Sequence, residues 1–103
     1  MSDPTEPVYG SNSGMSIHAL FNYYYGDGLE PDAGPYDVRA RLIFLGRRWQ
    51  EAQLERTISQ AKHGKSRVGI WNNLLSMLDR EISITEAVNM SLMNERRVLY
   101  NET

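Results

Sequence analysis

The side chains best suited to acid–base chemistry near neutral pH are two histidines, His18 and His63, in a chain of 103 residues. His18 falls outside the apolar side of a predicted helix, and His63 falls at the end of another, where free carbonyl groups favour a positive charge. The chain has no cysteine, no G-x-S-x-G nucleophile turn and no H-E-x-x-H zinc pair. The sequence therefore predicts no catalytic residue, no metal site and no cofactor. We expect a protein that is not an enzyme.

Two further segments fall short of a ligand-binding motif. Gly64, Lys65 and Ser66 match the end of the phosphate-binding sequence G-x-x-x-x-G-K-[ST], but its first glycine would fall at Ser59, and a helix precedes it where a strand is required. Residues 26–34 (GDGLEPDAG) contain three acids, but their spacing matches no calcium loop. We expect a helix end at Gly64, a solvated connector over 26–34 and no small-molecule ligand at either.

Charge is unevenly distributed along the chain, although the net charge is only −2. Residues 1–37 contain six acids and no lysine or arginine, residues 38–67 carry a net charge of +6, and the remainder carries −2. Opposed blocks of this kind can neutralise one another within a fold, drive contacts between copies, or leave a basic face for phosphate. The sequence favours internal neutralisation and leaves the other two possibilities open.

Nucleic-acid binding is accordingly an alternative function. It could use a helix-turn-helix-like pair at the C-terminus, although that part of the chain is acidic overall and its turn lacks the usual glycine. It could instead use the basic central segment. The candidate contacts are Arg47, Arg48, Lys62, Lys65, Arg67, Arg96 and Arg97.

The element that must position most of these residues is a predicted helix from Pro35 to His63. Proline suits the first helical position, and Gly64 suits the position after the last. At about 100° per residue the helix carries two opposite apolar stripes. The first contains Val38, Leu42, Leu45, Trp49 and Ala52, and the second contains Tyr36, Ala40, Ile43, Leu54, Ile58 and Ala61. Such a helix is about 43 Å long, so we expect either a bend near Gly46 or a second molecule that covers the overhang.

Shorter helices are predicted on both sides. Ile17, Leu20, Phe21 and Tyr24 form one stripe of a helix that ends at Gly26, and residues 67–81 form the cleanest amphipathic helix in the chain. Ser83 and Glu86 have the spacing of a helix start, and a break around 89–91 would keep Glu95 away from an apolar face. The predicted fold is therefore all-α, a small bundle in which a long central helix pairs antiparallel with a second helix, with short helices at both termini.

The chain is predicted to be one domain over residues 15–103, preceded by a flexible tail over residues 1–14 that is rich in Pro, Ser and Gly. No apolar run approaches the length of a membrane span, and the first residues lack the pattern of a signal peptide. We expect a soluble protein of the cytoplasm that contacts no membrane.

These features favour a non-enzymatic protein–protein interaction or assembly subunit. Small accessory or structural proteins of viruses, phages and mobile elements are often of this kind. Tyrosine and arginine are enriched in protein interfaces, and the central helix is apolar on two sides. The candidate interface residues are Tyr23, Tyr25, Tyr36, Ile43, Phe44, Arg47 and Arg48. Self-association or a protein partner is expected.

Overall fold

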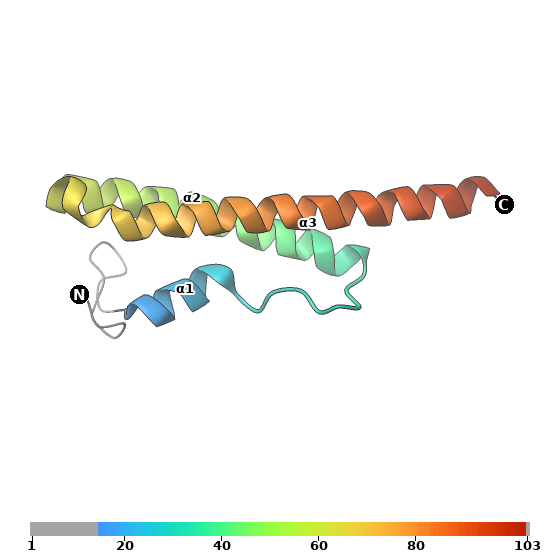
Figure 1. Ribbon diagram of the computed structural model, residues 1–103, viewed down its shortest axis with the longest axis horizontal. Coiled ribbons are helices and arrows are strands. Elements are labelled where there is room, and N and C mark those ends of the chain that lie inside the picture. The colour runs from blue at the N-terminus through green and yellow to red at the C-terminus, as the bar shows by residue number, and fades with distance from the viewer. Residues whose placement is uncertain (1–14, 103) are drawn as a thin grey trace.

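The computed structural model describes the backbone of residues 15–102 and the side chains of residues 15–97. The described chain is helical, in the order α1 (Ile17–Tyr25), α2 (Pro35–His63), a short 3₁₀ turn η1 (Gly64–Arg67) and α3 (Gly69–Glu102) (Figure 1). The all-α prediction is thus confirmed. The predicted tail over 1–14 lies outside the described residues.

The long helix α2 has the bounds that the sequence predicts. At its start the Gly34 N–H donates to the Asp37 carboxylate at 3.1 Å, next to Pro35 in the first helical position. At its end Gly64 has φ 70°, and its N–H donates to the carbonyl of Gln60. The helix is unbroken through Gly46.

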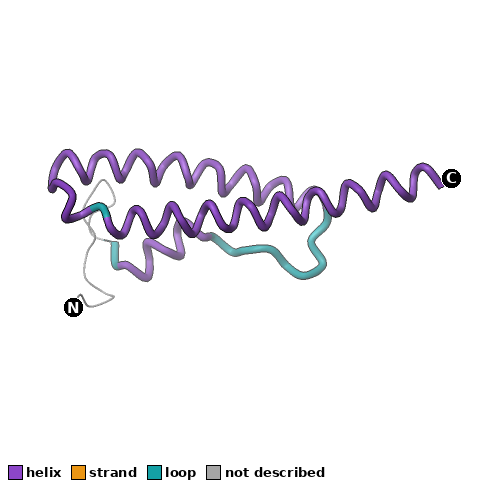
Figure 2. Tube along the Cα trace, turned by 45° about the horizontal axis from the view of Figure 1, so that its top comes forward, coloured by secondary structure: helices purple, strands orange, loops and turns teal. Residues whose placement is uncertain are grey.

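The helices α2 and α3 form an antiparallel hairpin that turns at η1, and they lie side by side along most of α2 (Figures 1 and 2). Ser59 Oγ donates to the carbonyl of Arg67 at 3.2 Å across the turn, and Arg56 Nε donates to Asn72 Oδ1 at 2.6 Å. The described molecule is consequently a rod, with extents of 60 × 23 × 19 Å.

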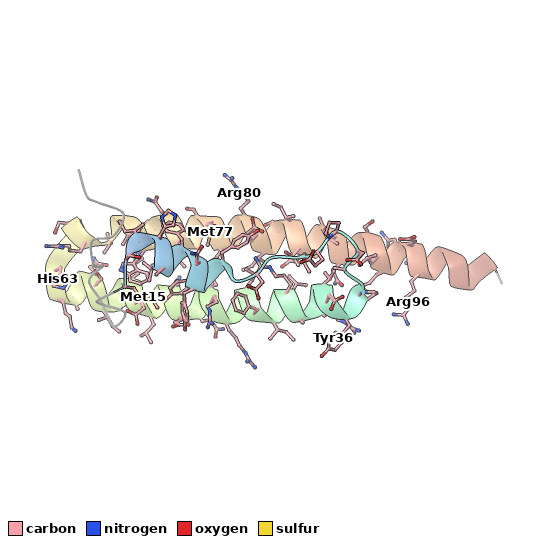
Figure 3. All side chains as sticks on the ribbon, turned by 90° about the horizontal axis from the view of Figure 1, so that it is seen from below. Met15, Tyr36, His63, Met77, Arg80 and Arg96 are labelled. Atoms are coloured by element: carbon pink, nitrogen blue, oxygen red, sulfur yellow. The ribbon has the colours of Figure 1, made fainter. Side chains whose placement is uncertain are left out.

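The core is a single line of side chains where the three helices meet, with α1 lying along the hairpin on one side (Figure 3). Tyr24 of α1 meets Trp71 of α3 edge to face, with ring centroids 5.9 Å apart, and both residues are fully buried. The connected cluster of fully buried side chains contains Leu20, Tyr24, Leu45, Ala52, Trp71, Leu74 and Leu78, and Val38 is fully buried near the start of α2. The first stripe of α2 therefore faces inward.

The C-terminal part differs from the sequence prediction, because α3 is one continuous helix of 34 residues. There is no new start at Ser83 and no break around 89–91, so the expected short C-terminal helices are replaced by one long helix, and the described residues contain no turn of a helix-turn-helix there; the short N-terminal helix is present as α1. The break was expected because an unbroken helix would place Glu95 on an apolar face. At about 51 Å, α3 is longer than α2 and runs past it, so Glu95 lies exposed where nothing is available to pack (Figure 2).

None of the helices within residues 15–102 has the length and apolar character needed to cross a membrane.

Candidate interaction surfaces

The second apolar stripe of α2, called here the outer stripe, is largely exposed. It contains Tyr36, Ala40, Ile43, Leu54, Ile58 and Ala61. Tyr36 is 78% exposed and points away from α3 (Figure 3), while Ile43 and Leu54 are each 59% exposed. Ile58 is half-buried. The outer stripe stays uncovered because α1 and α3 both pack on the other side of α2.

A second exposed apolar surface lies on the far half of α3. Ile84, Val88, Met90 and Met93 are between 38% and 59% exposed. Asn89 and Leu92 in the same stretch are half-buried, and Thr85 is the last buried side chain of α3 among the described residues. Thr85 Oγ1 donates to the carbonyl of Glu81 at 2.6 Å, which satisfies the hydroxyl within the helix.

An aromatic–arginine cluster fastens α1 to α2. The Tyr23 hydroxyl donates to the Glu51 carboxylate at 2.9 Å, and Arg48 forms a salt bridge with the same carboxylate at 3.2 Å. The Arg48 guanidinium lies 4.0 Å from the Tyr23 ring centroid and 4.7 Å from that of Phe44. Arg48 Nε also donates to the Tyr23 carbonyl at 3.2 Å. These side chains are thus engaged within the molecule.

The hydrogen bond to Glu51 raises the pKa of Tyr23 above its ordinary value of 10.0, and burial and the charge of Glu51 add to this effect. Ionisation of Tyr23 would remove its hydrogen bond, bury a charge and place a second negative charge beside the carboxylate, so all three causes raise the pKa of Tyr23, while the nearby Arg48 guanidinium opposes the shift. Tyr23 therefore remains a hydrogen-bond donor throughout the neutral range.

Arg41 is a buried cation that the sequence analysis missed. Only 7% of its surface is exposed, and its Nη1 donates to the carbonyl of Tyr25, whose ring centroid lies 4.7 Å from the guanidinium carbon. Its Nη2 is buried without a hydrogen-bond partner. The position could have been found from spacing, since it falls between Val38 and Leu45 on the inward side.

Arg41 borders a cavity of about 480 Å³ between the start of α2 and the connector that follows α1. Four carboxylates share its wall with this single guanidinium, so its charge is predominantly negative. The lining residues are Gly26, Asp27, Gly28, Leu29, Glu30, Asp32, Ala33, Asp37, Ala40, Arg41 and Phe44. The acidic connector is therefore folded against α2, and Asp27, Glu30 and Asp32 stay exposed.

Neither histidine lies at the cavity, and the described carboxylates are distributed along the rod. His18 and His63 are both exposed. Within the described residues, no group of three or more His, Cys, Asp or Glu side chains is arranged to hold a metal ion.

The seven candidate interface residues separate into two groups. Tyr36, Ile43 and Arg47 are exposed on the outer side of α2. Tyr23, Tyr25, Phe44 and Arg48 instead belong to the contacts between α2 and the segment of α1 that ends at Tyr25, although 37% of Tyr25 remains exposed.

The seven candidate nucleic-acid contacts are distributed over three places. Lys62, Lys65 and Arg67 are exposed together at the hairpin turn. Arg47 and Arg48 lie near the middle of α2, and Arg96 and Arg97 are exposed on α3 at the opposite end of the rod (Figure 3).

The chain matches no protein-family model, and no curated protein and no solved structure matches it.

Proposed function

We propose that this protein is a non-enzymatic interaction or assembly subunit that binds a protein partner through the outer stripe of α2. The observation that supports the proposal is the exposure of Tyr36, Ile43 and Leu54 along one line of a helix. Several large apolar side chains exposed on one helix face of a small protein commonly mark an interaction site. The exposed apolar residues of α3 beyond Thr85 offer a second contact surface.

The energetics agree with this proposal. Complete burial of a leucine or isoleucine side chain contributes roughly 1.5–3 kcal/mol, so Ile43 and Leu54 have much of that free energy still to gain from a partner. Arg47 lies exposed between them, and arginine is a common component of interface centres. A partner could thus gain both apolar contact and specificity from one face of α2.

The proposal is tested by introducing a charge into the stripe. Ile43→Asp and Leu54→Asp should abolish partner recovery by tagged protein or lower the molar mass measured by light scattering. Gln53→Asp is the matched control, because Gln53 is an exposed residue of α2 outside the outer stripe. Circular dichroism should show an unchanged helix content in all three variants. A wild-type protein that is strictly monomeric and recovers no protein would refute the proposal.

We further propose a cytoplasmic location, with the virion as an additional location if the protein is viral. Cell fractionation and imaging of the tagged protein test this proposal.

Nucleic-acid binding at the hairpin turn is a second candidate function, favoured by the joint exposure of Lys62, Lys65 and Arg67. Neutralising phosphates with lysine and arginine releases counterions, so binding should weaken steeply with salt. Lys62→Gln with Lys65→Gln should then reduce retention on DNA or RNA, whereas Arg96→Gln with Arg97→Gln at the other end should not. The absence of retention at low salt would exclude this candidate.

A further inference from the structure

We infer that the partner of the outer stripe is a second copy of this chain, packed antiparallel along α2 so that Ile43 faces Leu54 of the partner subunit. This inference rests on the proposed function, because it names the partner for the same surface. It depends on the spacing of the exposed residues and on the charges at the two ends of α2.

The exposed side of α2 has the spacing of a helix–helix seam. Starting at Tyr36, exposed positions recur at alternating intervals of four and three residues, which keeps one line of side chains facing a neighbouring helix. These seam positions are Tyr36, Ala40, Ile43, Arg47, Gln50, Leu54, Thr57 and Ala61. They lie opposite the packed side, which contains Val38, Leu45 and Ala52. A second long helix could therefore lie along the whole of α2 without displacing α1 or α3.

The seam is nearly symmetric about its centre, between Arg47 and Gln50. Ile43 and Leu54 are equally far from this centre along the chain, as are Tyr36 and Ala61. An antiparallel pair related by a twofold axis therefore brings Ile43 against the partner's Leu54 twice, and sets the large Tyr36 ring against the small Ala61 of the partner subunit twice. It also places Arg47 opposite the partner's Gln50.

A parallel pair would be less favourable in the same positions. It would place Arg47 opposite the partner's Arg47, with like charges facing across the seam, and Tyr36 opposite the partner's Tyr36. The sequence of large, small and charged residues along the seam thus favours the reversed direction.

The charges of the segments that precede and follow α2 favour the same direction. The acidic connector lies along the first turns of α2, where it shares a cavity wall with Arg41 and Phe44, and it exposes Asp27, Glu30 and Asp32. The last turn of α2 exposes Lys62, and η1, which follows it directly, exposes Lys65 and Arg67. The first and last turns of α2 lie at opposite ends of the helix, as Tyr36 and His63 show in Figure 3.

An antiparallel pair therefore sets the acidic end of each copy beside the basic end of the other, twice per dimer. The register that matches Ile43 with Leu54 of the partner subunit also places the start of α2 in each copy beside the end of α2 in the other. A parallel pair would bring acidic to acidic and basic to basic. Two independent features, the seam and the end charges, thus specify one arrangement.

The absence of cysteine from the chain makes a direct test of this arrangement possible. In the double variant Ile43→Cys with Leu54→Cys, the two thiols of one chain lie about 16 Å apart along α2, well beyond the reach of a disulfide. Mild oxidation should therefore link two chains. Residues held together experience an effective concentration near ~1 mM, so at ~10 μM protein linkage should be about a hundredfold faster than for unassociated thiols.

Two control variants set the reference rates. Ile43→Cys with Gln53→Cys places the second thiol on an exposed position outside the seam and should link at the slow rate. Ile43→Cys alone should also link slowly, because antiparallel copies hold the two substituted positions far apart. Rapid linkage by the single variant would indicate a parallel pair and overturn the inference, as would equal rates for the two double variants.

A charge-exchange experiment tests the ends of the rod. A variant with Lys62→Glu and Lys65→Glu has two acidic ends, and one with Asp27→Lys, Glu30→Lys and Asp32→Lys has two basic ends. Each alone should associate at least tenfold more weakly than the wild type, whereas their equimolar mixture should form a heterodimer. A mixture that associates no better than the separate variants would overturn the inference.

The molar mass separates failure of this inference from failure of the proposed function. Light scattering should give twice the chain mass of 11.8 kDa for the wild type and 11.8 kDa for Leu54→Asp at the same concentration. A wild-type monomer at all concentrations that still binds a different protein through the outer stripe would overturn the inference and leave the proposed function in place. A monomer that binds no protein would overturn both.

Discussion

Replacing Gly26 by alanine tests whether the connector is held against α2 by close contact. Gly26 has φ 75° and ψ −152°, a region that residues with a side chain rarely adopt. A Cβ atom there would lie 2.7 Å from the Phe44 ring and 3.2 Å from Arg41 Nη1. The substitution therefore combines backbone strain with a steric overlap.

Gly64 provides a matched reference for the backbone component. Its φ of 70° and ψ of −166° are similar, but a Cβ built there would meet no atom within 4 Å apart from its immediate chain neighbours. Gly64→Ala should cost the strain alone, roughly 1–3 kcal/mol. Gly26→Ala should cost the same amount plus the overpacking penalty at Phe44, typically another 1–3 kcal/mol.

The assay is urea denaturation followed by circular dichroism at one protein concentration, since any association would make stability depend on concentration. We expect the midpoint order wild type, then Gly64→Ala, then Gly26→Ala, with unchanged slopes. A Gly26→Ala variant as stable as Gly64→Ala would show that the connector moves freely away from Phe44 and would refute the packing described here.

Three further substitutions probe the helices and the cluster between them. Gly46→Ala should raise the free energy of unfolding by about 0.5–1 kcal/mol in the same denaturation assay, because Gly46 is inside α2 and a Cβ there would meet no atom within 4 Å. Trp71→Ala should lower it by about 3–5 kcal/mol, since this fully buried ring belongs to the core cluster that all three helices contribute to. A loss below about 1 kcal/mol would contradict the core assignment. Glu51→Gln should lower the pKa of Tyr23 towards 10.0. The Tyr23 titration is obtained by ultraviolet absorbance as the difference between each protein and the same protein carrying Tyr23→Phe.

The raised pKa of Tyr23 also predicts that the free energy of unfolding falls at high pH. A group that holds its proton more tightly in the folded state stabilises the fold fully below its unfolded pKa, here 10.0, and this contribution is lost as pH rises through the folded pKa. The wild type should therefore lose stability above pH 10.0 more steeply than Tyr23→Phe. Equal slopes for the two proteins would show that the bond to Glu51 contributes nothing.

The bounds of α2 and its two apolar stripes were predictable because the signals for them are local. Pro35 and Gly64 act through the backbone of their own positions, and apolar spacing reports a helix whichever way it faces. The same local reasoning was wrong at Ser83, where the spacing to Glu86 resembles a helix start but lies within α3. Continuing an existing helix gains one hydrogen bond per residue, whereas a break loses several.

The roles of Glu51 and Arg41 could not be predicted from local patterns. Glu51 is one acid among many in the sequence, but the position of α1 makes it the acceptor for Tyr23 and Arg48. Arg41 interrupts the apolar residues on the inward side, and its burial depends on where the connector returns along α2. Both outcomes depend on contacts between segments that are distant in the sequence.

The sequence by itself determined that this protein is helical, where α2 begins and ends, and that α2 has two apolar sides, because hydrogen bonding and side-chain period act within a few residues. The tertiary structure alone decided which side is buried. The inner stripe is covered because α1 and α3 share one side of α2 around Tyr24 and Trp71. The outer stripe is exposed because, within residues 15–102, the two long helices and the short one leave no further element to cover it.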